Sequence, residues 1–162
     1  MTHKNNVVVV IPVYKNNLDV YESISLEQAH RVLGQYEIRF IAPRGWRATY
    51  GGFSDNIKVE YFEAHFFQSK HTYSRLMLSP DFYNRFIDFE YMLIYQLDAF
   101  VFSDQLTYFC DLGYDYIGAP ISRWISIWRP LKKRVGNGVA ALFLCPRTAH
   151  SPCQNLLTTF AA

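Results

Sequence analysis

Asp98 is the residue of this sequence whose surroundings best suit chemistry. It stands between two apolar runs, Tyr91–Tyr95 before it and Ala99–Phe102 after it. The first run predicts a buried strand that delivers Asp98 at its carboxyl end. Because a desolvated carboxylate costs free energy unless it is paired, Asp98 needs either a structural partner or a ligand. Ligands of open α/β sheets gather at the carboxyl ends of the strands, so this position favours a binding site.

Gln96 and Asp98 offer the oxygen atoms that a divalent cation prefers. A carboxylate at a strand end commonly holds Mg²⁺ or Mn²⁺, which then bridges the oxygens of a diphosphate. Gln96 lies two residues before Asp98, on the same face of the strand, and can add a carbonyl oxygen. The pattern predicts Asp98 as a metal ligand. The alternative is a structural acid that caps the following segment.

Three further segments suit an anionic ligand. The basic run Arg129–Arg134 can neutralise a diphosphate, and Gly136-Asn137-Gly138 lets the backbone approach a ligand closely. Their alternatives are a solvated surface and a plain turn. Tyr73, Ser74 and Arg75 can contact a phosphate, but a helix start with an exposed arginine explains them equally well.

Several classes of protein are excluded by what the sequence lacks. The five histidines show no metal-ligand spacing, and there is no nucleophile elbow, no phosphate-cradling Gly-Lys-Ser/Thr loop and no Gly-x-Gly-x-x-Gly dinucleotide loop. These absences argue against a serine hydrolase, a P-loop NTPase and a typical NAD enzyme. The net charge of +2 is too small to indicate general nucleic-acid binding.

Strands and helices are expected to alternate along the chain. Apolar runs predict strands at 7–11, 37–42, 57–62, 91–95, 116–119 and 139–145. Helical periodicity predicts helices at 25–33, 72–78 and 82–89, with a break near Pro80, and a short helix after Ser103. This alternation is typical of an α/β fold with a mostly parallel sheet. Without an internal repeat or a linker, residues 1–162 are expected to form one domain.

Capping signals set the expected ends of two helices. Ser25 with Gln28 has capping-box spacing, and Gly34 is the expected stop of that helix. Ser103 is expected to cap the later helix, and Gly113 to end it. Three residues of that later helix share an apolar face: Leu106, Phe109 and Cys110.

Composition bounds the class of protein and its surroundings. Half of the residues are hydrophobic and 19% are charged, which excludes a disordered chain. Aromatic residues make up 17%, enough for an aromatic core or for rings that line a sugar or base site. Three cysteines without metal spacing, and no signal peptide, predict a reducing cytoplasm. No apolar run approaches the roughly 20 residues of a transmembrane helix, which leaves peripheral membrane association through a partner open.

Several segments together resemble one family of domains. In chain order they are Val8–Tyr14, Tyr73–Ser79, Tyr91–Phe102, Tyr114–Pro120 and Val135–Gly138. Over about residues 7–138 this order resembles the DUF5672-type domains of bacteria and fungi, which are related to GT-A glycosyltransferases. The Asp-Tyr-Ile-Gly-Ala-Pro segment and the Gln-x-Asp strand end are the most specific parts of the resemblance.

The resemblance implies a single Rossmann-like domain of the GT-A type that binds a nucleotide sugar. The loop after the first strand would approach the nucleotide through Pro12, Val13, Tyr14 and Lys15. Gln96-Leu97-Asp98 would stand where GT-A enzymes carry Asp-x-Asp, the motif that holds Mn²⁺ or Mg²⁺ against the diphosphate. Here the first acid is Gln96, so one charged metal ligand is lost. Gly136, Asn137 and Gly138 would lie near the sugar and the acceptor, and Arg75 near the donor.

The last part of the chain departs from the family pattern. After Gly138 the family is expected to continue with Gly-Phe-Ser-Leu-Arg, followed by an acidic segment that supplies the general base. This chain instead continues with Val139–Pro146. The departure motivates the hypothesis that the sequence is truncated or frame-shifted near Gly138. Asp115 is then a candidate for the catalytic base, although an acid next to a sheet end can also be structural.

Three functions follow from this sequence. The first is a glycosyltransferase that transfers a sugar from a nucleotide-sugar donor to a glycan or surface polysaccharide. The second is a nucleotide- or glycan-binding domain without turnover, a degenerate or truncated relative of such enzymes. The third is a Rossmann-like scaffold for protein partners, for which no nucleotide-dependent stabilisation is expected.

Overall fold

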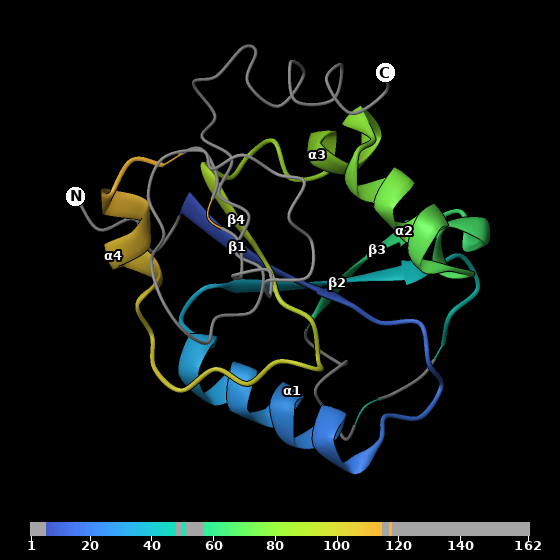
Figure 1. Cartoon of the computed structure of the whole chain (residues 1–162), viewed down its shortest axis with the longest axis horizontal. Coiled ribbons are helices and arrows are strands. Elements are labelled where there is room, and N and C mark those ends of the chain that lie inside the picture. Colours follow the sequence, from blue (N-terminus) through green and yellow to red (C-terminus); the bar gives the residue numbers. More distant parts are fainter. Residues whose placement is uncertain (1–5, 48–49, 51–56, 115–116, 118–162) are drawn as a thin grey trace, which may run out of the picture.

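Four short apolar segments form a parallel sheet in the computed structural model (Figure 1), which describes residues 6–47, 50, 57–114 and 117. The strands are β1 (Val7–Pro12), β2 (Glu37–Pro43), β3 (Lys58–Phe62) and β4 (Tyr91–Ile94). Their order across the sheet is β3-β2-β1-β4, and every neighbouring pair is parallel. The predicted α/β class and parallel sheet are confirmed, and the four predicted strands within these ranges form within one or two residues of their expected ends.

β1 is the centre of the sheet because it is apolar on both faces. Val7 to Ile11 are completely buried. Val7, Val9 and Ile11 belong to one apolar cluster, whereas Val8 and Val10 belong to a second cluster on the other face. A strand covered on both faces requires a continuous β-branched run, and this requirement explains why the sequence signal for β1 is so clear.

Helix α1 (Val20–Leu33) covers the first face of the sheet. Its N-terminus is a capping box made by Asp19 and Glu22, five residues earlier than the start predicted at Ser25. The prediction was wrong because Ser25 and Gln28 lie inside the helix, buried against the sheet. Their polar atoms bind a distant segment of the chain and are therefore not needed at a helix end. The predicted stop is confirmed, since Gly34 is the C-terminal cap.

The second face is covered by the 3₁₀ helix η3 (Ala64–Phe67) and by helices α2 (Lys70–Met77) and α3 (Pro80–Asn84). The break near Pro80 is confirmed, because Ser79 caps α3 and Pro80 occupies its first turn. The predicted helix at 82–89 is shorter than expected. After Asn84 the chain tightens into turns in which Phe86 and Phe89 each donate to the carbonyl three residues earlier.

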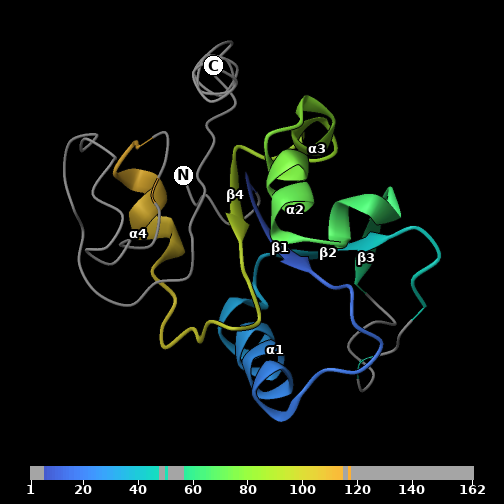
Figure 2. The same ribbon diagram turned by 45° about the vertical axis from the view of Figure 1, so that its right-hand side comes forward.

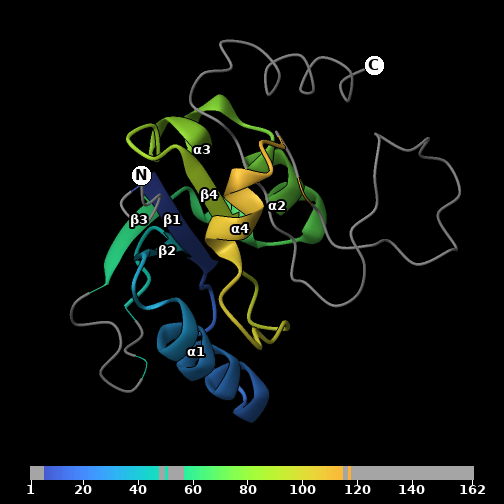
Figure 3. The same cartoon turned by 90° about the vertical axis from the view of Figure 1, so that its left-hand side faces the viewer.

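Helix α4 (Leu106–Asp111) lies beside β4 (Figure 3) and packs into the cluster that also contains α1. Gly113 has a positive φ of 64°, which suits its predicted role as the helix stop. Ser103 is not the cap that was predicted. Instead Oδ1 of Asp104 accepts a hydrogen bond from Leu106 N at 3.0 Å. The strands predicted at 116–119 and 139–145 lie outside the described residues, apart from residue 117.

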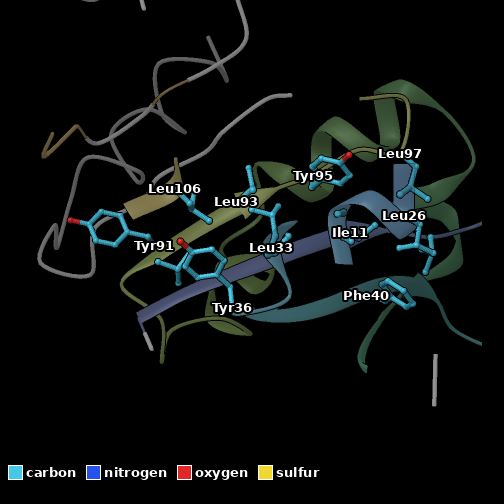
Figure 4. Close-up of a cluster of buried hydrophobic side chains, with 14 of the residues drawn as sticks. Ile11, Leu26, Leu33, Tyr36, Phe40, Tyr91, Leu93, Tyr95, Leu97 and Leu106 are labelled. Carbon is cyan, nitrogen blue, oxygen red and sulfur yellow. The ribbon is translucent and has the colours of Figure 1, made fainter. Parts of the chain in front are cut away.

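The sheet therefore lies between two helical layers. Figure 2 shows α1 on one side of the strands and α2 and α3 on the other. Figure 4 shows side chains from β1, β2, β4 and α1 that point into one cluster, with Leu26 and Leu97 at the same end of it. No helix among the described residues is both long enough and apolar enough to cross a membrane.

Arg39 joins the second helical layer to the sheet. Its guanidinium pairs with Glu37 at 2.8 Å and with Glu60 at 3.2 Å, and it lies over the ring of Phe89 at 4.9 Å. The Arg39 side chain is only 13% exposed, so these contacts are shielded from water. Burial raises the pKa of Glu37, but Arg39 and then Lys58 outweigh it and hold that pKa below its usual value.

We expect Arg39→Ala to lower the free energy of unfolding by about 2–3 kcal/mol, because it removes the least exposed cation beside Glu37 and Glu60 together with the contact with Phe89. The exposed side chains of Lys58 and Arg85 then remain as the cationic partners of the two carboxylates. The measurement is urea denaturation followed by circular dichroism. Lys58→Ala is the matched control, since Lys58 pairs with the same Glu37 but is 69% exposed. That control should change stability by less than about 0.5 kcal/mol. Equal losses in both variants would contradict the role of Arg39.

Tyr36 makes the stability of the fold depend on pH in the alkaline range. Its hydroxyl donates to both carboxylate oxygens of Asp104, at 2.9 and 3.0 Å. Burial, and then the hydrogen bond with Asp104, raise the pKa of Tyr36 from 10.0 to about 12. The neutral phenol is thus favoured in the folded state. Its contribution to stability is present below pH 10 and is lost as the pH rises towards 12.

We expect the stability of the protein to fall between pH 10 and pH 12, and Tyr36→Phe to reduce the steepness of that fall. The measurement is the midpoint of urea denaturation across this range. Tyr108→Phe, at a tyrosine that is 58% exposed, is the control and should leave the slope unchanged. Parallel curves for the wild-type protein and Tyr36→Phe would contradict the assignment.

Candidate functional site

The order of the strands reverses at the carboxyl ends of β1 and β4. The chain passes from β1 to β2 and β3 towards one edge, then returns to add β4 on the other side of β1. Val10 pairs with Ile94, and the next residue, Tyr95, donates from N to Val10 O at 2.9 Å. The loops after the two strands therefore leave the same edge in different directions. This is the topological switch point at which open α/β sheets bind their ligands.

The loop after β1 is fixed by its backbone and leaves its side chains exposed. Val13 is buried and donates from N to Ile41 O at 2.8 Å. The carbonyl of Lys15 accepts hydrogen bonds from Trp46 Nε1, at 3.2 Å, and from the Tyr50 hydroxyl. Tyr14, between these anchors, is 54% exposed. The predicted donor loop is thus a rigid support that presents Tyr14 to the solvent.

Carboxylates already occupy the N-terminus of α1. Asp19 and Glu22 cap its backbone N–H groups, and Lys15 Nζ pairs with Glu22 Oε1 at 2.5 Å. The hydrogen bond with Glu22 raises the pKa of the Lys15 ammonium. A phosphate at this helix end would meet two negative charges, in contrast to the dinucleotide folds that hold a pyrophosphate there. An anionic ligand must therefore bind elsewhere along the edge.

Residues after β4 alternate between buried and exposed. Tyr95 and Leu97 are buried, whereas Gln96 and Asp98 are exposed. The premise that Asp98 is desolvated between two apolar runs is therefore wrong, because the strand ends at Ile94 and Asp98 lies in a turn closed by Ala99 N to Gln96 O at 3.0 Å. Asp98 makes no hydrogen bond or ion pair with another described residue. Its carboxylate is open to a ligand.

Buried polar groups bind the turn that carries Asp98 to helix α1. The Tyr95 hydroxyl donates to Ala99 O at 3.0 Å and shares a hydrogen bond with Ser25 Oγ at 2.8 Å. Ser25 Oγ has one proton, which it can donate either to the Tyr95 oxygen or to Ala99 O, and Gln28 Nε2 donates to Val101 O at 2.8 Å. These contacts give the backbone of residues 96–101 fixed partners, and they therefore position Asp98 through the chain.

Tyr73 contributes a buried hydroxyl from the other face of the sheet. The ring packs into the second cluster, and its Oη has no hydrogen-bond partner in the part of the chain that the structure describes. Burial raises the pKa of Tyr73, the Gln96 side chain lowers it, and the nearby Tyr14 raises it again. Tyr73 is therefore near the Gln96 side chain at the end of β4. A buried hydroxyl without a partner costs free energy, so this group is available to a ligand or to a rotated Gln96 amide.

Arg75 is not brought to the same place as Tyr73. The two residues are two positions apart on α2, a rotation of roughly 200° about the helix axis. Leu76, next to Arg75, faces the core, whereas Arg75 itself is exposed. Sequence reasoning chose the arginine of this segment for its charge. The signal that would have favoured Tyr73 is the spacing of the apolar residues at positions 73, 76 and 77, which marks the face of α2 towards the sheet.

The described residues offer two oxygen-bearing side chains for a divalent cation. No three histidine, cysteine, aspartate or glutamate side chains within the described ranges lie close enough to hold a metal. Asp98 and Gln96 supply one carboxylate and one amide, and both are exposed. This donor set fits Mg²⁺ or Mn²⁺ only where the ligand's phosphates complete the coordination, as Mg²⁺ sites commonly do.

The remaining predicted site residues lie outside the described part of the chain: Asp115, Gly136, Asn137 and Gly138, with the basic run 129–134. Within the described part, the structure brings the loop of Pro12 to Lys15 to the same edge as Gln96 and Asp98. It also brings Tyr73 to this end of the sheet, a residue that the sequence suggested as a phosphate contact together with Ser74 and Arg75, although only Arg75 was predicted as a donor-binding residue.

A family model matches the part of the chain that contains Tyr73, Gln96 and Asp98. A family model described as "Protein of unknown function (DUF5672)" matches residues 56–142, more than half of the chain. The chain belongs to the DUF5672 family. The DUF5672 match includes Tyr73, Gln96 and Asp98, and β1 with its loop precedes it. No curated protein and no solved structure matches the chain significantly. The family description names no activity, so the relation to GT-A enzymes stays a prediction.

We expect Tyr95→Phe to loosen the turn of Asp98, because two hydrogen bonds of its hydroxyl are lost. The cost should be about 1–2 kcal/mol of stability, with faster amide hydrogen exchange at residues 96–101. The measurement is hydrogen exchange followed by mass spectrometry. Tyr108→Phe is again the control, at an exposed ring. Unchanged exchange in this segment would show that α1 does not hold the turn through Tyr95.

Proposed function

We propose that this protein binds a nucleotide-sugar donor at the carboxyl ends of β1 and β4 and transfers the sugar to a glycan or surface polysaccharide. The observation that carries the proposal is the carboxylate of Asp98, exposed and without an ion pair among the described residues, on a turn that α1 holds in place. It lies at the switch point of a parallel sheet, where ligands of such sheets bind. The resemblance to GT-A enzymes at Gln96-Leu97-Asp98 supports the choice of ligand.

Three residues near the carboxyl ends of β1 and β4 have roles in this proposal: Tyr14, Tyr73 and Asp98. Tyr14 offers an exposed ring against which the nucleotide base can stack, on a loop that is held by Trp46 and Tyr50. Tyr73 donates its free hydroxyl to the donor. Asp98 contacts the sugar or ribose, or holds Mn²⁺ or Mg²⁺ together with the diphosphate. When bound, the cation neutralises charge on the departing diphosphate.

The reaction is a displacement at the anomeric carbon. The acceptor hydroxyl oxygen forms a bond to that carbon while the bond to the diphosphate oxygen breaks, and the diphosphate leaves with the electron pair. The proton of the acceptor hydroxyl passes to a general base, for which we propose Asp115. Gly136, Asn137 and Gly138 then contact the sugar and the acceptor. Loss of a general base typically lowers the rate by about 10²–10⁴-fold.

A second function is favoured by the identity of residue 96. With Gln96 in place of an acid, Asp98 is the one carboxylate that the described turn offers to a metal. Such a site suits a domain that binds the donor, or a glycan, without turning it over. Release of free nucleotide diphosphate in the presence of acceptor separates the two functions, because a binding domain releases none.

The first test is a thermal-shift titration with UDP, GDP and CMP and their common sugars, with and without Mn²⁺. At a ligand concentration 100 times the dissociation constant, binding should add about 2.7 kcal/mol of stability. Asp98→Asn should remove the shift. Asp88→Asn is the control, because Asp88 is also exposed but lies before β4, at the opposite edge of the sheet. No shift with any nucleotide would contradict the transferase and a domain that binds the donor without turnover, and it would leave only glycan binding.

A second test restores the missing acid. If Gln96 and Asp98 share a cation, Gln96→Glu adds a second carboxylate and should lower the Mn²⁺ concentration at half-maximal shift by about tenfold. Gln68→Glu, at an exposed glutamine beside η3, is the matched control. Equal Mn²⁺ dependence in the two variants would mean that Asp98 contacts the donor without a metal.

A further inference from the structure

A second candidate site lies on the edge strand β3, beside the donor loop. An open hollow of about 530 Å³ runs between the segment after β2 and the outer part of β3. Its polar and aromatic lining comes from Arg44, Trp46, Arg47, Glu60, Tyr61 and Arg85. Within the described sheet β3 pairs only with β2, which leaves this flank of the strand uncovered. The volume suits one small molecule.

Cations outnumber anions in this hollow. Three guanidinium groups line it against the single carboxylate of Glu60. Glu60 is already engaged, by Arg39 at 3.2 Å and by Arg85 at 3.5 Å. Arg47 makes no ion pair with a described residue. An incoming anion would therefore meet positive charge that the described residues leave uncompensated.

The Arg44 guanidinium is also available to a ligand. It pairs with Glu63 at 3.1 Å, but the two side chains are 67% and 57% exposed. Ion pairs this exposed contribute little to stability, so a bound anion can replace Glu63 as the partner. Gly45 has a φ of 87°, a left-handed conformation that reverses the chain between Arg44 and Arg47. The turn places both guanidinium groups on the hollow.

Aromatic rings supply the other half of the lining. Tyr61 is 41% exposed on β3, and Trp46 forms the wall towards the donor loop. Trp46 Nε1 also donates to the carbonyl of Lys15, so the same indole belongs to the hollow and to the support of Tyr14. Flat apolar faces next to guanidinium forks suit a sugar ring that carries an anionic group.

We infer that the hollow binds an anionic sugar, a single ring with a phosphate or a carboxylate group. The guanidinium groups of Arg44 and Arg47 hold the anion, and the ring lies against Tyr61. The binding itself goes beyond the proposed function. We further infer that the hollow is the acceptor site, because Trp46 joins it to the loop that supports the donor. This second step rests on the proposed function, and it makes an acidic glycan the class of acceptor.

The test is isothermal titration of the full chain with glucose 6-phosphate, glucuronate, neutral glucose and inorganic phosphate. Both anionic sugars, or one of them, should bind at least about tenfold more tightly than glucose and than phosphate alone. The preferred anion identifies the source of the charge. If phosphate alone binds as tightly as glucose 6-phosphate, or if glucose binds as tightly as the anionic sugars, the inference is overturned.

Variants place the binding in the hollow. Arg47→Ala and Tyr61→Ala should each weaken the anionic sugar by about tenfold, whereas Tyr61→Phe keeps the ring and should retain binding. Lys70→Ala is the control, because Lys70 is an exposed cation on α2 outside the hollow. Equal binding in Arg47→Ala and in Lys70→Ala would overturn the assignment.

The same variants separate this inference from the proposed function. Arg47→Ala should leave the nucleotide-dependent thermal shift unchanged, and Asp98→Asn should leave anionic-sugar binding unchanged. If the anionic sugar binds but no nucleotide does, the result supports binding in the hollow and contradicts the proposed function. If Arg47→Ala abolishes the nucleotide shift, the hollow holds the diphosphate of the donor, and the inference of a separate site is overturned.

Discussion

The burial of β1 on both faces is the constraint on which the rest of the structure depends. A strand without an exposed face needs neighbours on both edges and helices on both sides, and β2, β4, α1 and α2 supply them. Because β4 joins β1 on the side opposite to β2, the carboxyl ends of β1 and β4 form the switch point of the sheet. The position of the candidate site thus follows from how the most apolar segment is covered.

Irregular backbone beside the sheet must find hydrogen-bond partners, and this requirement shapes the candidate site. The segment after β4 is no strand, so its carbonyls are bound by side chains of Ser25, Gln28 and Tyr95. These buried groups bind the side of the turn that faces α1, and Asp98 is exposed to solvent. The result is an exposed carboxylate on a turn whose backbone is bound to α1, without a hydrogen bond or ion pair to another described residue, and this arrangement suits a ligand contact.

Acidic and basic side chains lie at different places along the carboxyl ends of the strands. At the N-terminus of α1, Asp19 and Glu22 occupy the helix end and Lys15 is paired with one of them. Along β3, arginines exceed their carboxylate partners, and the hollow stays basic. Trp46 lies between these regions, bound to the carbonyl of Lys15 on one side and lining the hollow on the other. The surface near β3 is therefore more complementary to an anion than the N-terminus of α1 is.

The sequence by itself determined the four strands of the described sheet, because their apolar runs must be buried. It also determined the helix boundaries at Gly34, Pro80 and Gly113, because these residues act through local backbone conformation. Only the tertiary structure decided the start of α1, since the partners of Ser25 lie about 70 residues away and no local pattern records them. The same holds for Asp98, which was expected to be desolvated and is exposed. It also holds for Asp104, which accepts a hydrogen bond from Leu106 N where Ser103 was expected to act, and for the Tyr73 hydroxyl, which has no partner among the described residues. Periodicity reports which side of an element is buried, but the partner of a polar side chain depends on which distant segment packs against it.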